Sequence, residues 1–148
     1  MGVCRFYQGR VPEAVQYAQA TIRLQPRAAK AHDLLGMALA MQNQNESALD
    51  EMHRAVELAP DDAEIRNDLA AALVRLGRIP EAINEFHEAL RLNPNHAPAH
   101  ANLGSVLLTS GKAQESIPEF EAALRLDPNS KAAADGLRQA HAQLSEQK

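Results

Sequence analysis

The chain has 148 residues, of which 45% are hydrophobic and only 3% aromatic, and its formal net charge is −4. This length suits one domain with a continuous core, and the acidic balance argues against a protein that binds the phosphate backbone of nucleic acids. No apolar run approaches the ~20 residues that a membrane span needs, and the lone Cys4 excludes an internal disulfide.

Prolines divide the chain at a constant interval. Pro26, Pro60, Pro94 and Pro128 lie 34 residues apart, and each stands two residues after a leucine. Because proline cannot continue a helix, each one marks a helix end. A fixed period of this length indicates a repeat architecture.

Each period is predicted to contain two helices, a first and a second, joined by a tight turn. First helices are expected over 29–42, 63–76 and 97–110, and second helices over 12–25, 46–59, 80–93 and 114–127. The turns are held by Gly9, Asn43, Gly77 and Gly111. Glycine and asparagine accept the left-handed conformation that ends a helix. Asp62 and Asn95 are expected to cap first helices, and Asn45 a second helix.

Small residues recur at fixed places in the period, which indicates close contact between helices, because a larger side chain there would overpack. The small-residue columns are Gly2, Gly36, Ala70 and Gly104; Ala14, Ala48, Ala82 and Ser116; and Thr21, Ala55, Ala89 and Ala123. Larger apolar columns fill the space between them: Leu35, Leu69, Leu103 and Leu137; Leu39, Leu73 and Leu107; and Met52, Phe86 and Phe120.

The two ends differ from the middle. Residues 1–28 are predicted to be a partial first repeat, followed by full repeats at 29–62, 63–96 and 97–130. This pattern predicts a fragment of a longer protein, or a first helix that is cut short. Residues 131–148 are predicted to be a capping helix and tail, because Leu137 keeps the register while Arg138 replaces the small residue.

The chain resembles the tetratricopeptide repeat family, whose period and Leu-Gly, Ala, Phe and Pro pattern it shares. The repeat 97–130 carries the pattern best, with Leu103-Gly104, Phe120, Ala123 and Pro128, although His32 and His100 stand where the family has an early aromatic. The resemblance implies an all-α, right-handed solenoid of tandem helix-turn-helix units with a C-terminal capping helix. It also implies a scaffold that binds a protein partner, not an enzyme.

First helices are expected to line a concave groove. The candidate groove residues are Phe6, Tyr7, Lys30, Asp33, Met37, Met41, Asn67, Asp68, Ala71, Arg75, Asn102 and Ser105. The aromatic and methionine residues among them predict an adaptable apolar patch at one end. The asparagines, with Asp68 and Arg75, predict a polar strip that could bind the backbone of an extended peptide. The alternative is that all of these are ordinary solvated helix surface.

One class within the family holds the terminal carboxylate of a chaperone tail with a clamp of Lys, Asn and Arg. The corresponding positions here include Asp33 and Asp68, whose charge would repel such a ligand. The sequence therefore predicts a partner that is not an acidic peptide.

No residue set predicts catalysis, a cofactor or a metal. His96 and His100 lie four residues apart, but a zinc site needs further ligands, and Cys4 has no base placed beside it. The leading hypothesis is a scaffold that holds a peptide or helix of a partner protein, in the cytoplasm and without nucleic acid or membrane binding. The alternatives are self-assembly through the open N-terminal end, and a non-catalytic segment of a larger enzyme such as a glycosyltransferase.

Overall fold

The computed structural model describes residues 10–146, a range that contains helices and no strands. In chain order the helices are α2 (Val11–Leu24), α3 (Ala29–Met41), α4 (Asn45–Leu58), α5 (Ala63–Arg75), α6 (Ile79–Leu92), α7 (Ala97–Thr109), α8 (Ala113–Leu126) and α9 (Lys131–Glu146). The predicted all-α fold is confirmed, and every predicted helix within residues 10–146 is present. First helices end one residue earlier than expected, and second helices are shifted by one residue. No helix in this range is long and apolar enough to cross a bilayer.

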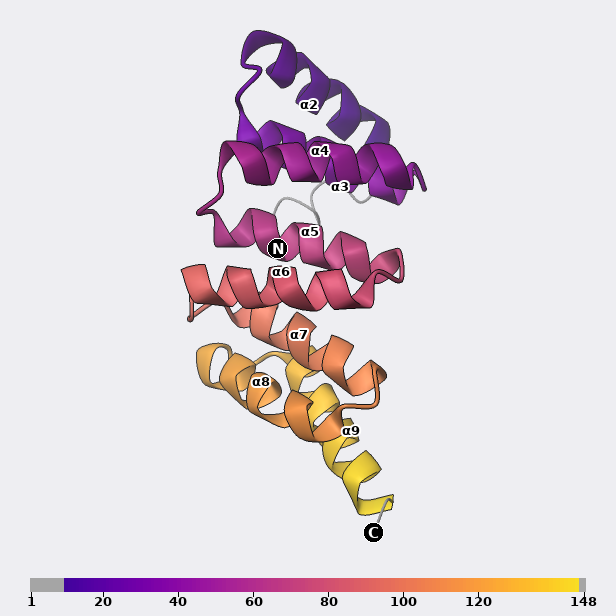
Figure 1. The fold of residues 1–148 in the computed structure, drawn as a ribbon, viewed down its shortest axis with the longest axis vertical. Helices are drawn as coiled ribbons and strands as arrows, with labels where there is room; N and C mark the ends of the chain where they lie inside the picture. Colours follow the sequence, from indigo (N-terminus) through magenta and orange to yellow (C-terminus); the bar gives the residue numbers. More distant parts are fainter. Residues whose placement is uncertain (1–9, 147–148) are drawn as a thin grey trace.

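The helices stack along the long axis of the molecule, with α9 at the C-terminal end (Figure 1). Each first helix packs against the second helix that follows it, as α3 does on α4, α5 on α6 and α7 on α8. Consecutive first helices also contact one another, α3 with α5 and α5 with α7, whereas contact between consecutive second helices is marginal at most. The right-handed solenoid is therefore concave on the side of α3, α5 and α7, which we call the concave face.

Turns between the paired helices have the predicted backbone. Asn43, Gly77 and Gly111 have φ angles of 61°, 74° and 78°, the left-handed conformation that ends α3, α5 and α7. Gly9 lies outside the described residues.

One of the three predicted helix caps is confirmed. The Asp62 side chain accepts hydrogen bonds from the backbone N–H groups of Glu64 and Ile65, at 3.0 and 3.2 Å. The prediction for Asn95 is wrong, because its own N–H donates to the Asn93 side chain in a turn that precedes the helix. His96 caps α7 instead, with Nδ1 accepting from the N–H of Ala99 at 3.2 Å. Asn45 is also not a cap, because α4 has already begun there.

The main core is shared by successive helix pairs. Met52 of α4, Leu73 of α5, Phe86 of α6 and Leu103 of α7 belong to one buried cluster. Phe86 is completely buried, and the cluster to which it belongs draws residues from α4, α5, α6 and α7. The small-residue columns are buried within residues 31–123 as predicted, so backbones approach closely where those columns meet.

A polar strap ties each full repeat to the loop that precedes it. His32, Arg66 and His100 occupy the same place in their repeats, and each contacts a carboxylate of the second helix and a backbone carbonyl of the preceding loop. These acceptors are Glu51 and Pro26 for His32, Glu85 and Pro60 for Arg66, and Glu119 and Pro94 for His100. The two acceptors flank the ring nitrogens of each histidine as they flank the guanidinium of Arg66, so the three residues make the same pair of contacts.

The capping helix α9 packs through a glycine that the repeat pattern left unexplained. Leu137 is half-buried, but the close contact is made by Gly136, where a methyl group would overlap the ring of Phe120. A methyl group on Gly104 of α7 would lie 2.9 Å from the same ring. Phe120 is fully buried between two helices that both need a residue without a side chain.

Replacement of Gly136 by alanine is expected to lower the free energy of unfolding by about 1–2 kcal/mol, because Phe120 cannot move without meeting α7. Alanine ordinarily stabilises a helix by about 1 kcal/mol relative to glycine. A lower free energy of unfolding in Gly136→Ala would therefore identify the overlap with Phe120 as its cause. Urea unfolding measures the change, with Gln139→Ala on the exposed side of α9 as the control. The loss should shrink in a Phe120→Leu background. A stabilised Gly136→Ala protein would contradict this packing.

Candidate functional site

The structure places the predicted groove residues on α3, α5 and α7, except Phe6 and Tyr7, which lie outside the described residues. Met37 packs against the main core, and Met41 and Ala71 are half-buried. Ser105 is exposed, and its hydroxyl donates to the carbonyl of Ala101 in its own helix. Part of the predicted apolar groove surface is therefore buried against the core.

Two aspartates meet on the concave face. Asp33 of α3 is 4% exposed, and its buried Oδ1 atom has no hydrogen-bond partner in the described part of the chain. Burial, reinforced by the charge of Asp68, raises the pKa of Asp33 to about 8. Burial and the charge of Glu64 raise the pKa of Asp68 on α5 to about 6. Near neutral pH, Asp33 therefore holds its proton while Asp68 is mostly ionised.

An ion-pair cluster lies beside these aspartates. Lys30 of α3 places its ammonium group 3.0 Å from a carboxylate oxygen of Asp62 and 3.0 Å from one of Glu64. Burial alone would lower the pKa of Lys30, but the hydrogen bonds to the two carboxylates outweigh it and raise the pKa. Lys30 thus joins α3 to the start of α5 and offsets part of the local negative charge.

A chain of amides continues the strip toward α7. Asn102 of α7 donates from Nδ2 to Oδ1 of Asn67 at 3.0 Å, and Asn67 donates in turn to Oδ1 of Asp68 at 3.2 Å. Asn67 is buried, so it supports its neighbours, whereas Asn102 is half-buried. Arg75 lies further along α5 and donates to the carbonyl of Ala40 at 3.3 Å. The structure therefore brings Asn67, Asp68 and Asn102 together and leaves Arg75 apart.

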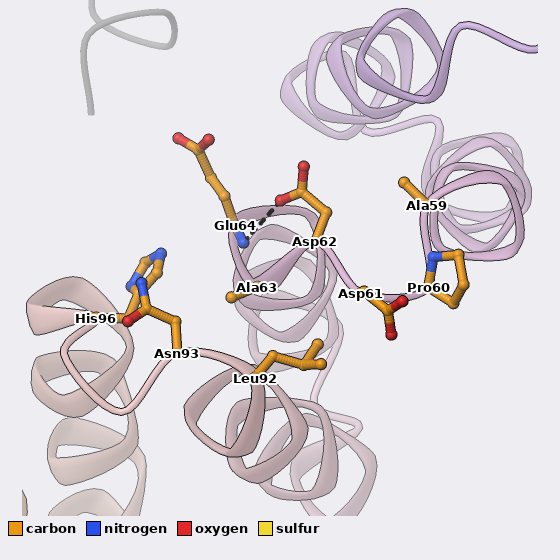
Figure 2. Close-up of a pocket in the computed structure, with 9 residues that line it drawn as sticks. All are labelled: Ala59, Pro60, Asp61, Asp62, Ala63, Glu64, Leu92, Asn93 and His96. Carbon is orange, nitrogen blue, oxygen red and sulfur yellow. Dashed lines mark hydrogen bonds between the residues drawn. The ribbon is translucent and has the colours of Figure 1, made fainter.

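An open pocket of about 680 Å³ lies between the loop that joins α4 to α5 and the loop that joins α6 to α7. Figure 2 shows Glu64, Asn93 and His96 gathered on one side of it, with Ala59 and Pro60 on the other. It shares Asp62 and Glu64 with the ion-pair cluster, but Asp33 and Asp68 do not line it. The pocket therefore adjoins the aspartate pair without containing it.

His96 and His100 have structural roles. Burial lowers the pKa of His96, which suits a neutral ring whose Nδ1 accepts the capping hydrogen bond. His100 belongs to the strap with Glu119. Within residues 10–146, no three His, Cys, Asp or Glu side chains are grouped so as to hold a metal ion.

Contacts between repeats join residues about one period apart, and the sequence analysis missed this. Lys30 and Glu64 are separated by 34 positions, and Asn67 and Asn102 by 35. The 34-residue period alone could have predicted that these residues lie side by side on neighbouring repeats. Nothing in the sequence signalled the burial of Asp33, which depends on how neighbouring helices pack.

The chain matches the profile of one protein family, described as "Tetratricopeptide repeat", over residues 5–63 and 67–131. Among curated protein sequences, none matches it.

Several solved structures have the same fold. MamA superposes with a TM-score of 0.79 at 20% identity, covering 95% of this chain and 77% of that one. The first TPR domain of Spaghetti (RPAP3), bound to the HSP90 peptide SRMEEVD, gives 0.76 at 23% identity, covering 79% and 95%. A chain of the APC/C hetero-tetramer Cut9–Hcn1 gives 0.82 at 22% identity, covering 92% of this chain and 28% of that one.

Asp33→Asn is expected to change how stability depends on pH. Because the pKa of Asp33 rises from 3.8 to about 8 on folding, the free energy of unfolding falls as pH increases across that interval. The asparagine variant has no such penalty, so at pH 9 it should be more stable than the wild type by at least about 1 kcal/mol. The advantage should vanish near pH 4.

Urea unfolding at both pH values measures this effect. Asp61→Asn, at an exposed position between α4 and α5, is the matched control. Equal pH dependence in the wild type and Asp33→Asn would show that Asp33 is not held in its uncharged form.

Proposed function

Because this chain belongs to the tetratricopeptide repeat family, we propose that it is a non-catalytic scaffold that holds a peptide segment of a partner protein in its concave groove. The observation that carries the proposal is the polar strip across three successive first helices. Asn102, Asn67 and Asp68 form a hydrogen-bonded chain, and Asp33 and Lys30 extend it to α3. Side chains held in this way are pre-organised, which lowers the entropy lost when a partner binds.

The solved relatives support a peptide as the occupant. The RPAP3 domain is bound to a peptide, SRMEEVD, that carries three acidic residues. In this chain the strip itself carries Asp33 and Asp68, so we expect a peptide of different charge.

Self-association is a second candidate. Two large apolar side chains of α2, Tyr17 and Leu24, are 61% and 84% exposed. Exposed apolar side chains on one helix of a solenoid can dock on a second copy. Tyr17→Ser with Leu24→Ser would remove this surface without touching the concave face.

Exchanging two charges should test the concave site. We expect Asp68→Lys with Arg75→Glu to weaken binding at least about tenfold, or ~1.4 kcal/mol, because the exchange inverts the charge pattern along α5. The ligands are peptides selected from a random 12-residue phage library on the wild-type protein, and fluorescence anisotropy measures their affinity.

The matched control is Arg54→Glu with Glu57→Lys, which exchanges an exposed ion pair on α4 and also leaves net charge unchanged. Circular dichroism shows whether each variant is folded. Equal affinity for the wild type and the α5 exchange would exclude the middle of the groove. A mass that rises with concentration in light scattering, and becomes monomeric in Tyr17→Ser with Leu24→Ser, would favour self-association instead.

A further inference from the structure

We propose that the centre of the concave face is a seat for one cationic side chain, a lysine or arginine of the bound peptide, between Asp33 of α3 and Asp68 of α5. This inference rests on the proposed function and specifies the chemistry of the partner.

Asp33 supplies the first argument. Its side chain is almost fully buried, and Oδ1 has no donor among the described residues. A buried polar atom without a partner is unfavourable, and most such atoms in folded proteins are satisfied. An ammonium or guanidinium group offers several donors and the opposite charge, so it would satisfy this carboxylate better than a neutral group would.

Charge supplies the second argument. The charges of Asp68, Glu64 and Asp62 all act on Asp33, and Lys30 is the cation that opposes them there. Lys30 is already shared between Asp62 and Glu64, at 3.0 Å from each. Lys30 offsets only part of the charge of Asp68, Glu64 and Asp62, so the surroundings of Asp33 keep an excess of negative potential, which attracts a cation and repels a carboxylate.

The residue types at the site favour a side chain over a free metal ion. The described residues include no group of three metal-ligating side chains, so the pair alone would hold a metal weakly. A lysine or arginine has a long stem and could reach the aspartates from a peptide backbone lying along the strip. The half-buried Asn102 of α7 lies beyond Asn67 and Asp68, where the neighbouring part of such a peptide would run.

Binding of a cation has a consequence for protons. Without a ligand, Asp33 is protonated near neutral pH, because burial and Asp68 raise its pKa to about 8 while Lys30 opposes them. A cation in contact with Asp33 favours the ionised carboxylate, so that proton is released when the peptide binds. Glu64 and Asp62 also act on Asp33 and add to the rise in its pKa.

The test uses five libraries of nine-residue peptides that are random except for a central Lys, Arg, Gln, Glu or Leu. On the wild-type chain, we expect the Lys and Arg libraries to be retained at least tenfold over the Glu library and several-fold over the Gln library. The preference should disappear in Asp33→Asn and in Asp68→Asn, and persist in Asp61→Asn. For one retained peptide, calorimetry in buffers of different ionisation enthalpy should detect proton release with the wild type and none with Asp33→Asn.

The outcomes separate this inference from the function on which it rests. If all five libraries bind equally, and the α5 charge exchange abolishes that binding, the cation seat is overturned while the groove remains a peptide site. If no library binds the wild-type chain, both are overturned. A preference for Lys and Arg that survives in Asp33→Asn and Asp68→Asn would place the cation elsewhere and also overturn the seat.

Discussion

Within residues 10–146, no helical hairpin buries its apolar side chains alone. Phe86 shows the constraint most clearly, because it is completely buried within a cluster that runs from α4 to α7. Burial of such a ring away from water is favourable because of the hydrophobic effect. Here the ring is buried only when the helix pairs on both sides are stacked against it. The same stacking sets α3, α5 and α7 side by side, so the concave face and its polar strip are products of the shared core.

The repeat pattern predicted the stacking well because each signal has a direct backbone cause. Pro60 and Pro94 each follow the end of a helix, and left-handed residues such as Gly77 end a helix in a fixed conformation, although Pro118 lies inside α8. The prediction was weaker where the pattern stops. In α9 the small residue that packs against Phe120 is Gly136, whereas Arg138, at the place of the small-residue column, is exposed. The cap of α7 was misplaced because His96 is an uncommon capping residue.

The candidate site was predicted by position but not by environment. Asp68 and Asn102 were correctly placed on first helices that meet. Sequence could not show that Asp33 is buried, since burial depends on the packing distance between α3 and its neighbours. Burial raises the pKa of both aspartates, and the charge of Asp68 adds to the rise for Asp33. A surface pair of the same residues would be ionised and screened, and would carry little specificity.

The central claim is that one core couples successive hairpins, and native-state hydrogen exchange on Phe86→Ala tests it directly. The account predicts that loss of this ring lowers the opening free energies of amides in α4, α5 and α7 as well as in α6. The loss should fade toward α2 and α9. If protection falls only in α6 and its partner α5, the hairpins stand independently and the shared core is contradicted.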